Sequence, residues 1–346
     1  MDSDLKGAVS TGTTLPKAAS QNRIDIVRSL LDEGADPNEI DSIGNTALHT
    51  AAEGGYWDIA RLLLERNASP TIKNANDSIP LHLAVKRCRH PVARLLLECE
   101  NSLLNYSNKQ MDSPIHIAAR NGDLEMINLL LEFKVNTSSI TTGNTTALHL
   151  AVEKEHQELC AILLEYDKKY SVPLVLRMVG YKAAHKTKDW HDETPFALAI
   201  KSGNINIIKV FFQSGTVSGK EKNGFKRPLF HDAVKEGKTE IVKTFLENGT
   251  DINMKGWDSQ RAIHVAVKEK DIDMVRLLLE YGPSLQVKDG SLCTPEQVSY
   301  DPEITMMLRN HGKDKNKDRG KRKKRSGEKS PPPRIASSAP PPEYTP

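Results

Sequence analysis

The sequence predicts an all-α repeat solenoid with a disordered C-terminal tail. One apolar motif recurs about every 33 residues over most of the 346-residue chain, and a fixed period of this length indicates stacked repeats. Aromatic residues make up only 5% of the chain, so we expect no large aromatic core. Residues 313–346 carry a net charge of +7, whereas the first 312 residues carry −4. We therefore expect two unlike parts.

The repeated motif contains a histidine in most of its copies. Thr46–His49 recurs as Ile79–His82, Ser113–His116 and Thr146–His149, and these histidines are 33, 34 and 33 residues apart. Later copies begin at Thr194, Pro228 and Arg261, with a weak first copy at Thr13 and a degenerate last copy at Thr294. A second apolar run, such as Leu62–Leu64, follows each copy about eleven residues later. This spacing predicts two helices in each repeat.

The pattern resembles the ankyrin repeat, whose signature is T-P-L-H-x-A at a period of 33 residues. The resemblance covers most of residues 10–312 and implies a helix–turn–helix plus a β-hairpin in each repeat. It implies about eight repeats and a degenerate C-terminal cap. Repeats 1–5 then occupy residues 10–167, repeats 6–8 and the cap occupy residues 188–312, and residues 1–9 form an N-terminal extension.

The ends of the first helix in each repeat have suitable residues. Threonine at the motif start can cap the helix with its hydroxyl, and proline one position later needs no backbone N–H. Just after the helix the chain needs a left-handed residue. Glycine occupies this position in four repeats, at Gly55, Gly122, Gly203 and Gly237. Asn22 can substitute, but Cys88, Glu155 and Lys270 fit less well, so we expect repeats 3, 5 and 8 to be locally weaker.

The histidines and cysteines point to structure rather than catalysis. Six of the eleven histidines share one motif position: His49, His82, His116, His149, His231 and His264. In the ankyrin family this histidine fixes the hairpin loop by hydrogen bonding, so we expect neither a catalytic nor a metal-binding role. The four cysteines form no C-x-x-C pair, as expected of reduced thiols inside a cell. We expect no cofactor and no metal.

The repeat spacing breaks once, at an insertion over residues 168–187. The step from His149 to Ala197 is 48 residues, which is 15 more than the period. The insertion contains an apolar run, Val172–Val179, which we expect to form a short extra helix packed on the array. Two alternatives remain open: a lengthened surface loop, which costs little stability, and a functional finger.

Aromatic residues occur near the predicted hairpin tips of three successive repeats, at Trp190, Phe225 and Trp257. In ankyrin arrays, partners bind the hairpin tips and the adjoining surface of the first helices. The three aromatics therefore predict a partner-binding stripe. The alternative is that the aromatics pack one hairpin tip against the next, since single exposed aromatics do not mark a binding site.

Polar residues at other hairpin tips are further candidates for the same partner-binding surface. Asp41, Asn76 and Lys109 occupy these positions in repeats 2, 3 and 4. Loops are polar by default, so a solvated turn is the competing interpretation.

Two short motifs lie in the tail over residues 313–346, which lacks the repeat and should stay disordered. The basic run comprises Lys321, Arg322, Lys323, Lys324 and Arg325. It resembles a nuclear-import signal, or else it is a solubilising or polyanion-binding run. Near the end, Pro341, Pro342 and Tyr344 form a P-P-x-Y motif like those that WW domains bind. A WW-containing ubiquitin ligase is one such partner.

The sequence favours a non-enzymatic protein-interaction adaptor that binds one partner through the array and another through the tail. The alternatives are an inhibitory ankyrin protein that masks a nuclear or signalling factor, and a pathogen effector that acts on host proteins. An enzyme is disfavoured, because the chain has no P-loop, no G-x-S-x-G and no H-E-x-x-H motif. We expect no nucleic-acid binding by the acidic array, and at most weak, salt-sensitive binding through the tail.

The expected location is intracellular, in the cytoplasm or the nucleus. The first residues form no apolar segment of the kind found in secretory signals, and no run of apolar residues reaches the length of a membrane span. We expect a monomer.

Overall fold

The computed structural model describes residues 13–169 and 183–311, and these contain eight pairs of antiparallel helices. By its internal contacts the chain divides into two compact units, Met1–Asp251 and Ile252–Pro346. The first unit contains seven of the helix pairs and the second contains one. This arrangement confirms the predicted all-α repeat solenoid.

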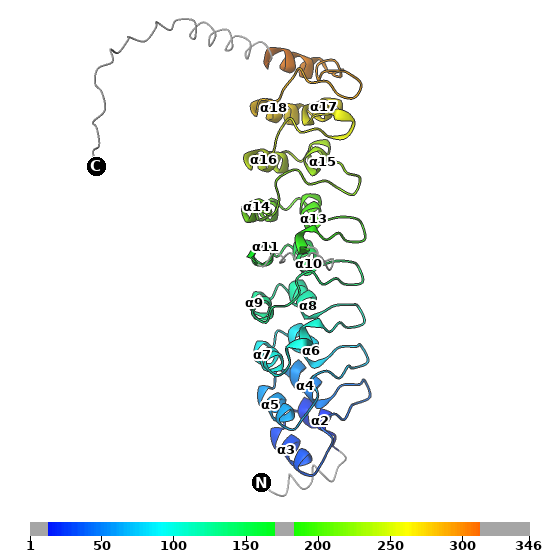
Figure 1. Cartoon of the computed structure of the whole chain (residues 1–346), viewed down its shortest axis with the longest axis vertical. Coiled ribbons are helices and arrows are strands. Elements are labelled where there is room, and N and C mark those ends of the chain that lie inside the picture. The colour runs from blue at the N-terminus through cyan, green and yellow to red at the C-terminus, as the bar shows by residue number, and fades with distance from the viewer. Residues whose placement is uncertain (1–12, 170–182, 312–346) are drawn as a thin grey trace, which may run out of the picture. The chain divides into compact units, whose positions relative to one another are not determined.

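In the first unit, the first helix of each pair packs against the first helices of its neighbours, and the second helices form a parallel layer (Figure 1). The first helices are α2 (Leu15–Ser20), α4 (Ala47–Gly54), α6 (Pro80–Lys86), α8 (Pro114–Asn121), α10 (Ala147–Glu153), α13 (Pro195–Ser202) and α15 (Leu229–Lys235). The second helices are α3 (Ile24–Asp32), α5 (Trp57–Glu65), α7 (His90–Cys99), α9 (Leu124–Glu132), α11 (Gln157–Lys169), α14 (Ile205–Ser214) and α16 (Thr239–Glu247). Hairpin loops project from the side of the first helices.

The predicted start signals are confirmed in five of the first helices of the described residues. The hydroxyls of Thr46, Thr146 and Thr194 each accept the backbone N–H three residues later. Pro80 and Pro114 stand at the first helical position, where the backbone needs no N–H donor.

The left-handed position after the first helix is also confirmed. Gly55, Gly122, Gly203 and Gly237 have φ angles between +66° and +79°. The non-glycine residues at this position, Cys88, Glu155 and Lys270, adopt φ values of +55°, +59° and +57°. A side chain at such an angle is crowded by the following carbonyl oxygen, so the lower local stability of repeats 3, 5 and 8 stays a prediction with a clear cause.

The core of the first unit lies between the two helix layers and between successive repeats. Alanines such as Ala51 and Ala84 are fully buried in the first helices, and leucines such as Leu63 and Leu96 are fully buried in the second. The small alanine side chains let neighbouring helices approach closely. Each repeat thereby buries apolar surface that it could not bury alone.

One part of this core is unexpectedly aromatic. Five of the seven phenylalanines cluster between repeats 6 and 7, namely Phe196, Phe211, Phe212, Phe230 and Phe245. Their ring centroids lie 5.2–5.8 Å apart in tilted or edge-to-face pairs, the geometry that aromatic rings prefer. The expectation of no large aromatic core overlooked this local concentration, because composition averages over the whole chain.

Two short 3-10 helices complete the described part of the first unit: η1 (Asn101–Asn105) and η2 (Ala184–Lys186). Helix α11 continues to Lys169 and η2 begins at Ala184, so the described residues include both ends of the predicted insertion at 168–187. Asp167 accepts a hydrogen bond of 2.8 Å from the Thr137 hydroxyl and lies 3.5 Å from His185, which joins the two flanks. The predicted helix over Val172–Val179 lies outside the described residues.

The second unit contains η3 (Trp257–Ser259), α17 (Ala262–Lys268) and α18 (Ile272–Glu280). Residues 295–298 form a turn where a ninth first helix would stand, and residues 302–311 are helical. Ile304 and Leu308 of this last helix are buried. The degenerate motif at Thr294 therefore closes the series with an incomplete repeat.

Candidate protein-interaction surface

The hairpin loops owe their shape to a polar residue at the start of each tip. Asp41 Oδ1 accepts the backbone N–H groups of Ile43 and Asn45 at 2.9 and 2.8 Å. Asn223 Oδ1 does the same for Phe225 and Arg227, at 2.9 and 3.0 Å. Asn and Asp side chains close tight turns in this way. In the described residues, the predicted β-hairpins contain isolated bridges, such as Ile40 to Thr46, rather than longer strands.

Backbone hydrogen bonds join several successive hairpins of the first unit. The N–H of Ala75 donates to the carbonyl of Ile43 at 3.0 Å, and that of Lys109 donates to the carbonyl of Asn76 at 3.1 Å. Because these bonds fix successive loops of repeats 2 to 5 to one another, this part of the tip face is preorganised. A partner that binds there loses little backbone entropy.

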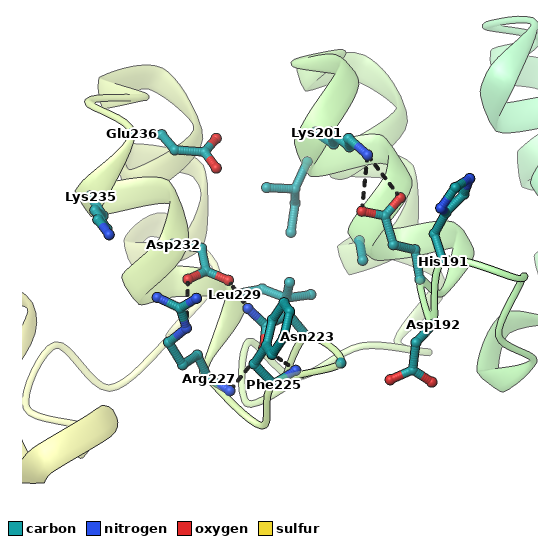
Figure 2. A pocket seen from close by; sticks show the side chains of 14 residues that line it. His191, Asp192, Lys201, Asn223, Phe225, Arg227, Leu229, Asp232, Lys235 and Glu236 are labelled. Atoms are coloured by element: carbon teal, nitrogen blue, oxygen red, sulfur yellow. Dashed lines mark hydrogen bonds and ion pairs between the residues drawn. The ribbon is translucent and has the colours of Figure 1, made fainter.

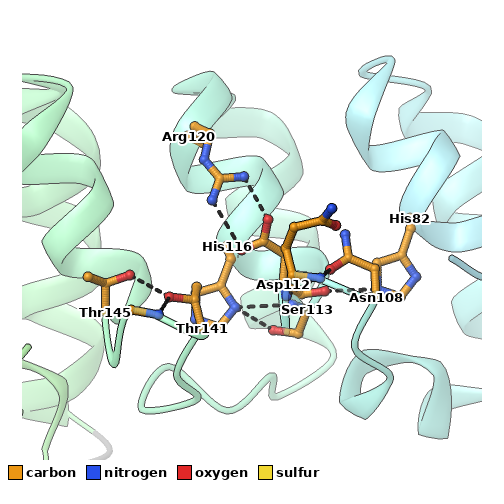
Figure 3. Close-up of polar contacts among 10 residues, drawn as sticks. His82, Asn108, Asp112, Ser113, His116, Arg120, Thr141 and Thr145 are labelled. Carbon is orange, nitrogen blue, oxygen red and sulfur yellow. Dashed lines mark hydrogen bonds and ion pairs between the residues drawn. The ribbon is translucent and has the colours of Figure 1, made fainter. Parts of the chain in front are cut away.

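The motif histidines hold the hairpins by hydrogen bonds to their backbone, as the resemblance implied. His116 Nδ1 accepts the backbone N–H of Ser113 at 3.1 Å, so its proton resides on Nε2, which donates to the carbonyl of Ser139 at 2.9 Å (Figure 3). The Nε2 of His82 likewise donates to the carbonyl of Asp112, at 3.2 Å.

Burial keeps these histidines neutral. It lowers the pKa of His82 from 6.5 to about 4, and it also lowers the pKa values of His49, His116, His149 and His264. Removing an imidazolium from water disfavours the charged form. Their role is to join one repeat to the next.

The three aromatic tip residues of the sequence prediction are largely exposed. The exposed fractions are 75% for Trp190, 76% for Phe225 and 70% for Trp257. Packing of one tip against the next would bury the rings of Trp190 and Phe225, which belong to the same unit, so their exposed fractions contradict that alternative for this pair. Trp190 and Phe225 lie on hairpins of the first unit, whereas Trp257 begins η3 in the second.

The polar candidates differ in how available they are. Asp41 is half-buried, and its carboxylate already holds its own loop. Asn76 and Lys109 have exposed side chains, although their backbone groups join the two hairpins. A partner could therefore reach the side chains of Asn76 and Lys109 more readily than that of Asp41.

Four further apolar residues on hairpins of the first unit are exposed and were missed by the sequence analysis. These are Ile40, Ile43, Met111 and Ile140. We call them, together with Trp190 and Phe225, the apolar tip row. The available sequence signal was an apolar residue within a short polar loop, which the search for aromatics passed over. The six residues lie on the hairpins of repeats 2, 4, 5, 6 and 7.

A groove of about 490 Å³ lies beside Phe225, between repeats 6 and 7 (Figure 2). Ala197 and Ile200 of α13 and Leu229 of α15 contribute apolar surface. Glu193 and Asp232 contribute carboxylates. The groove adjoins the apolar tip row, so both belong to one candidate surface.

Some features lie outside the described residues or are absent within them. Residues Lys321–Arg325, and Pro341, Pro342 and Tyr344, lie outside. Among residues 13–169 and 183–311, no group of three or more His, Cys, Asp or Glu side chains is arranged to hold a metal. No helix in these ranges is long and apolar enough to span a bilayer.

Comparison with known families gives the class of protein. The family model described as ankyrin repeats (3 copies) matches the chain over residues 15–107, 81–173 and 168–256. The family model for the ankyrin repeat matches residues 260–290. These matches cover most of the chain, so the protein belongs to the ankyrin repeat family. Ankyrin repeats are protein–protein interaction modules, and the family is typically non-enzymatic.

One similar protein is the transient receptor potential cation channel subfamily A member 1 homolog of Caenorhabditis elegans. It is 27% identical over 128 residues, which are 37% of this chain and 9% of that protein. The chain thus matches a small part of that relative's length.

Proposed function

We propose that the protein is a non-enzymatic adaptor whose ankyrin array binds a partner protein through the apolar tip row. The observation that carries this proposal is the exposure of six large apolar side chains on hairpins of the first unit. Burying such side chains against a partner gains roughly 25 cal/mol for each Å² removed from water. Aromatic anchors contribute disproportionately to such interfaces.

Site-specific photo-crosslinking tests this surface directly. Phe225→p-benzoylphenylalanine places a photoreactive group on the tip row, and Lys209→p-benzoylphenylalanine places it on the exposed face of α14. After irradiation in cells, we expect crosslinks between position 225 and a partner protein, and no crosslinked product of the same mass from position 209. Equal adducts from both positions, or none from position 225, would contradict it.

We further propose that the tail provides a WW-domain ligand through Pro341, Pro342 and Tyr344. A WW-containing ubiquitin ligase bound there would be brought to the client on the array. In a pull-down with purified WW domains, Tyr344→Ala should abolish recovery of the full chain. Tyr300→Ala, which changes an exposed tyrosine outside the motif, should leave recovery unchanged. Recovery that survives Tyr344→Ala would eliminate the WW ligand from the proposal.

Nuclear entry through Lys321–Arg325 is a separate part of the proposal. Replacing all five residues with alanine should lower the nuclear fraction of a fluorescent fusion, with the WW motif left intact. An unchanged distribution would leave this run as a solubilising segment. We propose that the adaptor acts as a monomer, which light scattering after size-exclusion chromatography tests. We also propose that it acts in the cytoplasm and nucleus, which imaging of the fluorescent fusion tests.

A further inference from the structure

The groove between repeats 6 and 7 lies where one bridging histidine of the array is missing. In repeat 5, His149 Nε2 donates to the carbonyl of Glu193 in the next hairpin at 3.2 Å. Repeats 2, 3 and 8 make the same type of bond from their histidines to the next hairpin. Repeat 6 has Ala197 at this position, so no imidazole can join α13 to the hairpin of repeat 7. Ala197 lines the groove instead.

The groove combines an apolar lining with partly shielded carboxylates. Ala197, Ile200 and Leu229 are almost fully buried and leave a narrow apolar strip. Glu193 and Asp232 line the groove with side chains that are 24% and 20% exposed. Burial raises the pKa of Asp232, with the Arg227 charge opposing that shift.

The resident cations leave the carboxylates room for a further partner. Lys201 Nζ reaches Glu193 at 3.2 and 3.3 Å, but its own side chain is mostly exposed. The Nε of Arg227 is 3.9 Å from Asp232, which is too long for a hydrogen bond. The Arg227 guanidinium instead lies 5.7 Å from the centre of the Phe225 ring. Asn223 Nδ2 also donates a hydrogen bond to Asp232 Oδ2, and Lys235 is a further cation lining the groove. Each carboxylate can accept several hydrogen bonds, so both keep capacity for one more donor.

We infer that the groove receives an arginine side chain from a partner protein that lies across the hairpin tips. The methylene stem would cover Ala197 and Leu229, and the guanidinium would reach the carboxylates of Glu193 and Asp232. Arginine suits this site better than lysine because its planar head makes several directed hydrogen bonds to carboxylates. Its stem also gains from apolar contact. This inference rests on the proposed function, since it assigns one side chain of the partner to the surface proposed there.

Peptide mixtures with one fixed central residue test the inference without knowledge of the partner. Fluorescein-labelled nonapeptides with randomised flanks carry arginine, lysine, citrulline or glutamate at the centre, and anisotropy reports their binding to the full chain. Citrulline has the shape of arginine without its charge. We expect the arginine mixture to bind about tenfold more tightly than the citrulline mixture, the size typical of a hydrogen-bonded charge pair. Equal binding of the two mixtures overturns the inference.

Two variants locate this preference in the groove. Ala197→His should fill the space, and Asp232→Asn should remove one carboxylate while keeping its shape. Both should reduce the arginine preference to less than about twofold. Asp58→Asn, which changes an exposed carboxylate on α5, should retain the preference. Circular dichroism verifies that each variant is folded. An arginine preference that persists in both groove variants places the site elsewhere and refutes the inference.

Further results distinguish the groove assignment from the proposed function and from binding of the chain's own tail. Crosslinked adducts at position 225 combined with no arginine preference would leave the proposed function standing and refute the groove assignment. Loss of the adducts themselves would refute the proposed function. The basic tail of the chain is another candidate occupant, tested by replacing Lys321–Arg325 with alanine. If this change strengthens binding of the arginine mixture tenfold, the tail occupies the groove and the partner assignment fails.

Discussion

Mild acid should destabilise the array by protonating its buried histidines. His82 provides the clearest case, because burial lowers its pKa from 6.5 to about 4. A histidine with a lowered pKa in the folded chain binds protons better when unfolded. Its contribution to stability is therefore complete above pH 6.5 and is lost as the pH falls toward 4.

The size of the effect follows from the two pKa values. A pKa difference of one unit corresponds to about 1.4 kcal/mol, so His82 alone contributes about 3 kcal/mol that is lost once the pH is below 4. Linkage places about 2 kcal/mol of this loss already at pH 5, where most carboxylates are still ionised. A comparison of stability at pH 7 and pH 5 therefore reports mainly the protonation of histidines.

The test compares the native chain with His82→Gln at pH 7 and pH 5. A repeat array need not unfold in one step, so the readout should be local: hydrogen exchange of the amides in α6 and α7, corrected for the intrinsic effect of pH. The variant should be less stable at pH 7 because it loses its hydrogen bond to the Asp112 carbonyl. Between pH 7 and pH 5, the variant should lose about 2 kcal/mol less local stability than the native chain loses.

His191→Gln provides the matched control, since His191 is exposed on a hairpin. This variant should lose as much stability between pH 7 and pH 5 as the native chain does. The reasoning fails if His82→Gln retains the full pH dependence. It also fails if the native chain keeps its stability until carboxylates become protonated below pH 4.

Other substitutions test the backbone and the core. Glu155→Gly should increase the local stability of repeat 5 by about 1 kcal/mol, because it relieves a side chain at φ +59°. Gly203→Ala should decrease that of repeat 6 by a similar amount through backbone strain alone, since no atom lies within 4 Å of the added Cβ. Hydrogen exchange measures both, and effects of the same sign would contradict the strain argument. Phe230→Ala should cost about 3–5 kcal/mol in urea unfolding, because its ring is fully buried in the phenylalanine cluster; a cost below about 1 kcal/mol would show that the cluster is loosely packed.

The sequence predicts the helix pairs, their caps and their left-handed ends because these depend on residues close together in the chain. Thr46 caps a helix that begins one residue later, and Glu155 adopts a positive φ because the turn after α10 requires it. The repeat period then assigns the same structure to every copy. The sequence also placed Trp190 and Phe225 at hairpin tips, but it left open whether their rings are exposed or packed against a neighbouring tip.

The remaining features depend on contacts between repeats, which the period does not reveal. The phenylalanine cluster draws Phe196 and Phe211 from one repeat and Phe230 and Phe245 from the next. The groove is lined by Ala197, which stands where other repeats have a histidine that reaches a hairpin about 30 residues further along. Ala197 occupies the histidine position of the copy that begins at Thr194, but the consequence of that change lies in the neighbouring repeat.

An array of similar repeats presents similar surfaces, so a partner can be positioned along it only by departures from the common pattern. Ala197, Trp190 and Phe225 are such departures, and all three belong to repeats 6 and 7. The loss of one bridging histidine weakens the junction between these repeats locally, because each repeat depends mainly on its neighbours. The phenylalanine cluster packs at the same junction and offsets that loss with buried apolar surface. The junction can thus remain stable while it keeps an open groove, which is the combination that a specific binding site requires.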